Sequence, residues 1–113
     1  MNDRLKVLFV CSKNQWRSPT AEKVYCRDER VSVRSRGTAR SAVRTITAAD
    51  LHWADLVLVM EGKHRNRIRA EFPQASRRSQ IYVLDVPDDY QFMDDELVEL
   101  IRSATDPIFS QHT

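Results

Sequence analysis

Cys11 and Arg17 are separated by five residues and directly follow the apolar run 7–10, Val-Leu-Phe-Val. A thiolate can act as a nucleophile, and the planar guanidinium of arginine matches two oxygens of a phosphoryl group. If the apolar run is a strand and a helix begins near Ser18, both side chains belong to one strand-to-helix turn. Backbone N–H groups of such a turn, together with the positive end of the helix dipole, favour a thiolate and a bound dianion. The segment therefore predicts a nucleophile in an anion-binding loop.

The other residues of this segment fit the same interpretation. Because 14 of the 113 residues are arginine, the spacing alone is weak evidence, and the flanking strand and helix signals supply the specificity. The Ser18 hydroxyl can cap the helix, with Pro19 at the first helical position, or donate to the thiolate, and we favour the capping role. Asn14 tolerates left-handed backbone angles in the middle of the turn. The residues that we expect to contact a substrate are Ser12, Lys13, Asn14, Gln15, Trp16, Ser18 and Tyr90.

Strand and helix patterns alternate along the chain. The expected strands are 5–10, 31–35, 56–60 and 81–84, and the expected helices are about ten residues from Pro19, a short helix from the Thr47 cap to Trp53, about 63–72, and one that begins at 94–96. This order predicts an α/β fold of three layers, with a four-stranded parallel sheet covered by helices on both faces. We expect a single domain over residues 1–113. In such sheets the site lies at the carboxyl ends of the strands, where the Cys11 turn is expected.

Composition excludes several classes of protein. The chain is 42% hydrophobic and 30% charged, and it has no run of about 18 apolar residues that could span a membrane. Its first residues lead directly into a short apolar strand, so we expect no signal peptide and a cytoplasmic location. Cys11 and Cys26 lack zinc-ligand spacing, so we expect no metal, no cofactor and no disulfide. We expect Cys26 to be an inert buried thiol on the first helix.

Charge is divided unevenly along the chain. Residues 1–80 carry 17 Lys and Arg against 8 Asp and Glu, and residues 81–113 carry 1 against 8, which gives +9 and −7. The basic clusters lack the interleaved aromatic residues of a nucleic-acid site, so we interpret them as solvated surface. The three histidines suggest no catalytic cluster. We expect His64 on a helix surface and His112 in the C-terminal tail.

The segment VLFVCSKNQWRSPTAE resembles the signature of the low-molecular-weight protein tyrosine phosphatases, V-x-F-V-C-x-x-N-x-x-R-S-P. Residues 35–38, Ser-Arg-Gly-Thr, are similar to a Ser-Ala-Gly-Thr segment of that family, and residues 54–60 also resemble it. The resemblance implies a flavodoxin-like phosphatase fold and hydrolysis of phosphotyrosine or a similar aryl phosphate through a cysteinyl-phosphate intermediate, without a metal. It assigns Cys11 as nucleophile and Arg17 as the phosphate-binding group, and it implies a phosphorylated protein or a small aryl phosphate as partner.

The resemblance also implies a general acid in an Asp-Pro loop far downstream. Residues 85–90, Asp-Val-Pro-Asp-Asp-Tyr, resemble that loop and place Asp88 at the acid's position, with Asp85 and Asp89 as alternatives. A phenolate leaving group needs a proton as the P–O bond breaks, and the resulting carboxylate can then activate water. Tyr90 either lines a pocket for the phenyl ring or packs against the last helix.

Three substitutions mark the sequence as a divergent relative, and the chain is also shorter than typical members of the family. Asp89 replaces the family's proline, Lys13 stands where members often have glycine, and Trp16 stands where many have a smaller residue. One alternative is therefore a phosphate-binding regulatory module with little turnover. Another is arsenate reduction, which some relatives with this loop perform and which needs a resolving thiol, for which Cys26 is the candidate.

Overall fold

Four strands and four helices alternate along residues 4–113, the part of the chain that the computed structural model describes. The elements are β1 (Leu5–Cys11), α1 (Arg17–Tyr25), β2 (Val31–Gly37), α2 (Ala48–Trp53), β3 (Leu56–Val59), α3 (Gly62–Glu71), β4 (Gln80–Val83) and α4 (Asp95–His112). The predicted alternation is confirmed, and the ends of the elements differ from the expected ones by a few residues.

The strands form one parallel sheet in the order β2-β1-β3-β4. β1 is central and pairs with β2 along its whole length, so that Cys11 lies beside Gly37. Its residues 7–10 are completely buried, as are most of the residues of β3. Such continuous burial is typical of inner strands of a sheet covered on both faces. The predicted four-stranded parallel sheet is confirmed.

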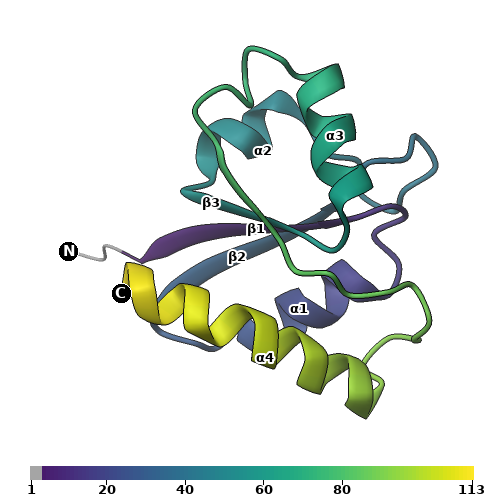
Figure 1. Cartoon of the computed structure of the whole chain (residues 1–113), viewed down its shortest axis with the longest axis vertical. Coiled ribbons are helices and arrows are strands. Elements are labelled where there is room, and N and C mark those ends of the chain that lie inside the picture. The colour runs from purple at the N-terminus through teal and green to yellow at the C-terminus, as the bar shows by residue number, and fades with distance from the viewer. Residues whose placement is uncertain (1–3) are drawn as a thin grey trace.

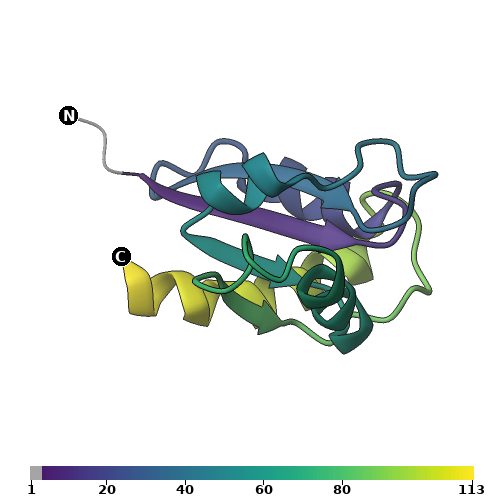
Figure 2. The same ribbon diagram turned by 90° about the horizontal axis from the view of Figure 1, so that it is seen from above.

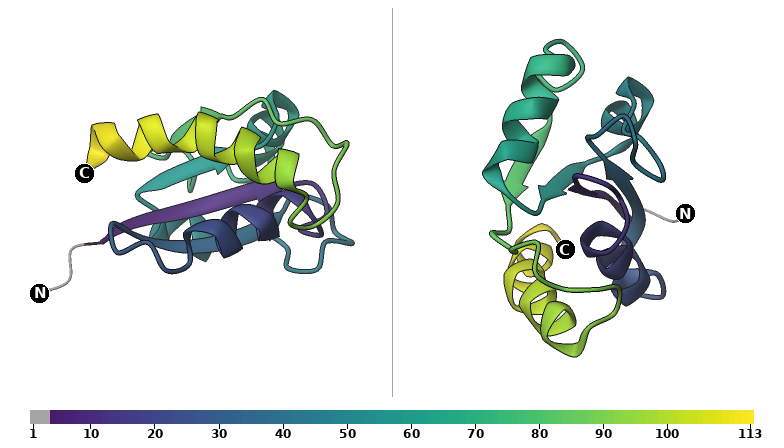
Figure 3. Two further views of the ribbon diagram at one scale, coloured as in Figure 1. Left: turned by 90° about the horizontal axis from the view of Figure 1, so that it is seen from below. Right: turned by 90° about the vertical axis from the view of Figure 1, so that its right-hand side faces the viewer.

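Two apolar cores lie on opposite faces of this sheet. Side chains of β1 alternate between them, because successive residues of a strand point to opposite faces: Val7, Phe9 and Cys11 belong to one core, and Leu8 and Val10 belong to the other. Burial of a Val, Leu or Phe side chain contributes about 1.5–3 kcal/mol. Figure 3 shows α1 and α4 on one side of the sheet and α2 and α3 on the other. The Cys11 side chain therefore points to the face of the sheet that α1 and α4 cover.

α4 covers its face of the sheet with one apolar stripe. The stripe recurs every fourth residue and consists of Leu97, Ile101 and Phe109, with the buried Thr105 between the last two. His112 is the last residue of this helix, and its Nε2 atom lies 3.1 Å from the Tyr82 hydroxyl, so the expectation that it belongs to a tail was wrong. None of the helices within residues 4–113 is long and apolar enough to cross a membrane.

The segment 38–45, which follows β2, supports the loop after β1 from behind. Its backbone N–H groups at Thr38, Ala39 and Val43 donate to the carbonyl oxygens of residues 11–13, over 2.9 to 3.0 Å. The approach is so close that a Cβ atom at Gly37 would lie 2.6 Å from the carbonyl oxygen of Ser12. Only glycine fits there without displacing the loop.

The connection from β4 to α4 is fixed at two points beside the same loop. The Val86 N–H donates to the Met60 carbonyl over 2.9 Å, and the Met93 N–H donates to the Thr20 hydroxyl over 2.9 Å. Between these points the chain crosses the carboxyl edge of the sheet, and Figures 1 and 2 show it passing the start of α1. The fold thus gathers the ends of β1, β3 and β4 at one edge.

Candidate active site

A loop of five residues joins Cys11, the last residue of β1, to Arg17, the first residue of α1. Asn14 in its middle has a φ of 54°, which confirms the predicted left-handed turn. The buried Asn14 amide donates to the hydroxyls of Ser18 and Ser35 over 2.9 and 3.0 Å. These bonds fix the curvature of the loop from inside.

Ser18 is not the helix cap that the sequence analysis favoured. α1 begins two residues earlier than expected, at Arg17, and no side chain caps it. The Ser18 hydroxyl is fully buried, lies 3.0 Å from the Cys11 sulfur and accepts a hydrogen bond from Asn14. Its own proton can go to the Arg36 carbonyl oxygen, 3.3 Å away, or to the sulfur when Cys11 is a thiolate. This geometry matches the second role considered for Ser18.

The backbone N–H groups of residues 12–18 donate no hydrogen bond within the described part of the chain. The carbonyl groups of residues 11–13, in contrast, are paired with segment 38–45. A curled run of unpaired N–H groups that leads into a helix N-terminus is an anion-binding concavity. The carbonyl groups of the loop are therefore hydrogen-bonded to segment 38–45, whereas its backbone N–H groups are left for a ligand.

Arg17 is held rigidly beside this loop. Its side chain is 2% exposed, its Nη1 donates to a Glu61 carboxylate oxygen over 2.6 Å and to the Val86 carbonyl over 2.8 Å, and its Nε lies 3.6 Å from an Asp88 carboxylate oxygen. Nη2 makes no hydrogen bond within residues 4–113. Two nitrogens therefore orient the guanidinium, and the third is left for an anion.

Glu61 was missed in the sequence analysis. The hydrogen bond from Arg17 lowers the pKa of Glu61, so this carboxylate stays charged beside the guanidinium. Its position gave a signal: Glu61 comes just after β3, and the carboxyl ends of parallel strands meet at one edge.

His64 lies inside the molecule, so the expectation that it occupies a helix surface was wrong. It is 1% exposed, its Nε2 lies 2.8 Å from the Ser12 hydroxyl, and its Nδ1 accepts from the Glu61 N–H over 3.0 Å. Burial, and then the nearby Arg17 cation, lower the pKa of His64 to about 4. The imidazole is therefore neutral at neutral pH.

The structure brings the three predicted catalytic residues to one narrow pocket. The residues that line it are Cys11, Ser12, Lys13, Gln15, Trp16, Arg17 and Asp88. Cys11 is 3% exposed, whereas the Asp88 side chain is 57% exposed at the mouth. Of the three aspartates considered as the acid, Asp88 lines the pocket, and Asp85 and Asp89 do not.

Three of the expected substrate contacts lie elsewhere. Asn14 and Ser18 are buried behind the loop rather than on its open side. Tyr90 donates its hydroxyl proton to the Glu96 carboxylate and packs against the core between β1 and α4, which is the second of its two predicted positions. Trp16, 37% exposed, remains as the aromatic side chain of the pocket rim.

Cys26 is exposed at the carboxyl end of α1, which corrects the expectation of a buried thiol. Cys11 precedes the amino end of the same helix, and a helix of nine residues is about 13 Å long. The two thiols are therefore not neighbours, which removes the basis for a resolving role of Cys26.

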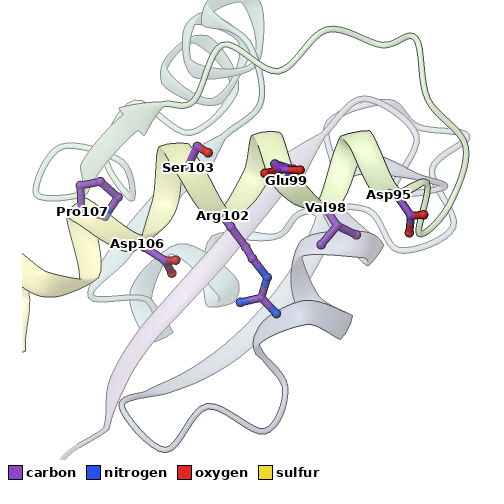
Figure 4. Close-up of a pocket in the computed structure, with 7 residues that line it drawn as sticks. All are labelled: Asp95, Val98, Glu99, Arg102, Ser103, Asp106 and Pro107. Atoms are coloured by element: carbon purple, nitrogen blue, oxygen red, sulfur yellow. The ribbon is translucent and has the colours of Figure 1, made fainter.

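A second groove, which is shallow, runs along α4 and shares no lining residue with the Cys11 pocket. Figure 4 shows Arg102 extending from the helix toward α1, with carboxylates along the same stretch; the lining residues are Asp95, Val98, Glu99, Arg102, Ser103, Asp106 and Pro107. Arg102 lies over the ring of Tyr25, 5.8 Å from its centre. Within residues 4–113, no group of three or more His, Cys, Asp or Glu side chains is arranged to hold a metal ion.

No protein-family model matches the chain, and no curated protein matches it significantly. Solved structures match it over nearly its whole length. The tyrosine phosphatase Wzb from Escherichia coli K30 in complex with phosphate is 23% identical, with a TM-score of 0.76 over 98% of this chain and 99% of that one. The low-molecular-weight protein tyrosine phosphatase SP-PTP from Streptococcus pyogenes is 23% identical, with a TM-score of 0.79 over 96% and 93%. The YwlE arginine phosphatase from Geobacillus stearothermophilus is 24% identical, with a TM-score of 0.72 over 95% of each chain.

These similarities concern the fold. The chain has the α/β fold of the low-molecular-weight phosphatases, as the sequence resemblance implied. It spans at least 93% of each of the three structures, so it is not short by comparison with them.

Proposed function

We propose that the protein is a cysteine phosphatase that needs no metal and hydrolyses phosphotyrosine or a similar aryl phosphate through a cysteinyl-phosphate intermediate. The observation that carries the proposal is a buried thiol, Cys11, at the start of a loop whose N–H groups at residues 12–18 have no hydrogen-bond partner among residues 4–113. Arg17 adds a fixed guanidinium at the same place, and its Nη2 is likewise without a partner in that part of the chain. Together they match a nucleophile and a phosphoryl group with three outer oxygens.

In the first step, the Cys11 thiolate attacks phosphorus, and the bond from phosphorus to the aryl oxygen breaks. Asp88, at the mouth of the pocket, gives its proton to the departing oxygen. Backbone N–H groups and the Arg17 Nη2 stabilise the negative charge on the three outer oxygens. The products are a phosphorylated Cys11 and a neutral phenol.

In the second step, water attacks the phosphorus of the phosphorylated Cys11. The Asp88 carboxylate takes a proton from this water as the P–O bond forms, and the S–P bond breaks to release phosphate. The Ser18 hydroxyl, 3.0 Å from the sulfur, donates a hydrogen bond to the departing thiolate and keeps its proton. The cycle ends with Asp88 protonated and Cys11 ionised, as it began.

The narrow pocket and Trp16 at its rim support an aryl group as the leaving group, because a ring can stack on the indole. A second candidate substrate is phosphoarginine. The Asp88 carboxylate can pair with a guanidinium at the mouth, and one of the structurally similar proteins is an arginine phosphatase.

The test is to trap the phosphoenzyme. The full-length protein is mixed with excess phenyl phosphate, or in parallel with phosphoarginine, quenched in acid within the first turnover and digested for mass spectrometry. We expect phosphate on the peptide that contains Cys11, and the faster-labelling substrate identifies the leaving-group class. Binding of inorganic phosphate without any label from either substrate would instead support a phosphate-binding module.

Replacing Asp88 with asparagine should separate substrates by their leaving groups. We expect kcat/KM to fall about 10²-fold for phenyl phosphate and little for 4-nitrophenyl phosphate, because 4-nitrophenol leaves readily without a proton. The measurement is steady-state kinetics with both substrates. Asp85→Asn and Asp89→Asn are matched controls, because their carboxylates lie outside the pocket lining. Equal losses on both substrates would argue against Asp88 as the acid.

A further inference from the structure

The imidazole of His64 is a buried titratable group that the two chemical steps leave unused. It lies in the first turn of α3 and contacts the Cys11 loop through one atom pair, Nε2 and the Ser12 hydroxyl oxygen, 2.8 Å apart. Ser12 directly follows the nucleophile and lines the pocket. The hydrogen bond to Ser12 is therefore the contact through which His64 can influence the Cys11 loop.

The hydrogen bonds of His64 determine which ring nitrogen carries the proton. The Glu61 N–H can only donate, so the Nδ1 atom that it contacts over 3.0 Å must be unprotonated. The ring is neutral at neutral pH, since burial and Arg17 lower the pKa of His64 to about 4. The single ring proton is therefore on Nε2, and His64 is the donor to Ser12.

The orientation of the Ser12 hydroxyl follows from this tautomer. Because its oxygen accepts from His64, its own hydrogen points away from the imidazole. Its backbone carbonyl is already occupied by the Ala39 N–H, and the neighbouring Cys11 sulfur lies beside Ser18 instead. Within residues 4–113 the Ser12 hydroxyl has no second partner, so the space left for its hydrogen is the pocket.

We propose that His64 is a positioning residue for the phosphate site, which fixes the Ser12 hydroxyl as an additional hydrogen-bond donor to an outer phosphoryl oxygen. This inference rests on the proposed function for its relevance to turnover, but its geometry concerns phosphate binding alone. Ser12 thereby joins the backbone N–H groups and Arg17 as a side-chain donor. Loss of His64 would let the hydroxyl rotate and accept from other donors instead.

Two substitutions separate the contact with Ser12 from the contact with Glu61. Asparagine at position 64 places its amide near Nδ1, so His64→Asn can keep the bond from the Glu61 N–H but does not reach Ser12. Glutamine reaches the place of Nε2, so His64→Gln can still donate to Ser12. We expect inorganic phosphate to bind about tenfold more weakly to the Asn variant and within about threefold of the wild type to the Gln variant, as measured by calorimetry.

A double-mutant cycle with Ser12→Ala completes the test. We expect Ser12→Ala to weaken phosphate binding as much as His64→Asn, and the double variant to be no weaker than either single variant. Additive losses of phosphate affinity in the double variant would overturn the proposal. So would losses of phosphate affinity in the His64→Asn and His64→Gln variants that only follow their losses of thermal stability. Absence of phosphate binding by the wild type would overturn it as well.

Nitrogen NMR of the wild-type protein gives a readout that needs neither turnover nor a variant. We expect the His64 signals of a neutral ring protonated at Nε2 and unprotonated at Nδ1, and the opposite tautomer would overturn the proposal. The phosphoenzyme experiment tests the proposed function separately. A protein that binds phosphate through His64 and Ser12 but never labels Cys11 would refute the phosphatase and retain this inference.

Discussion

Replacement of Cys11 with serine is expected to lower kcat for aryl phosphate hydrolysis by at least about 10⁴-fold. A serine hydroxyl needs a base to become a nucleophile, and Asp88, the carboxyl group that lines the pocket, carries a proton as the general acid of this step. The nearest imidazole, His64, is committed to Ser12, and Ser18 presents only another hydroxyl. The acid-quenched variant should also carry no phosphate on the peptide around position 11. The measurements are steady-state kinetics and mass spectrometry of the quenched protein.

The Cys11→Ser variant should still bind inorganic phosphate, because the N–H groups of residues 12–18 and Arg17 are unchanged. Cys26→Ser is the matched control: it makes the same chemical change in an exposed thiol at the far end of α1 and should leave kcat and KM unchanged. Substantial activity in the Cys11 variant, or a label on another residue, would refute the assignment of the nucleophile.

Replacement of Arg17 with lysine is the second large effect that we expect, with kcat/KM about 10³-fold lower. The substitution keeps a positive charge but removes the planar fork. One ammonium group cannot keep the contacts with Glu61 and the Val86 carbonyl and also present a donor to phosphate in the position of Nη2. The loss should appear in phosphate binding as well as in kcat. Kinetics with 4-nitrophenyl phosphate and calorimetry with inorganic phosphate measure the two effects.

Arg34→Lys is a suitable control for this change. Arg34 also pairs with a carboxylate, Asp50, and lies over the Trp53 ring, but it does not line the pocket. We expect the activity of the Arg34→Lys variant to equal that of the wild type. Circular dichroism must show that the Arg17 variant is folded, since it removes the guanidinium that donates to Glu61 and the Val86 carbonyl. Activity within tenfold of the wild type would mean that charge alone is sufficient at this position.

The fold and the loop were predictable because their determinants are local. The apolar run 7–10 could only be an inner strand, and Asn14 falls where the turn needs a left-handed residue. A single loop of five residues joins Cys11 to Arg17. Sequence spacing therefore described this part of the site well.

The roles of Ser18 and His64 depend on contacts between distant parts of the chain, and spacing does not reveal these. Ser18 precedes a proline and looks like a cap, but Asn14 and the Cys11 sulfur engage its hydroxyl. His64 lies 52 residues from its partner Ser12, on a helix whose other residues are mostly charged and exposed. Glu61 is similar, because its partner Arg17 is 44 residues away. Only the order of the strands brings these residues to one edge of the sheet.

The segment that carries Asp88 is tied down at Val86 and Met93 and is almost wholly exposed between them. Apart from Tyr90, which packs against one core, its side chains contribute little to either core, so changes in the other residues of 87–92 have a small cost in folding free energy. The same changes alter the reach of the acid and the width of the pocket mouth. Substrate range can therefore diversify in this segment by mutation or by grafting, while the nucleophile and the anion-binding loop stay on the rigid sheet.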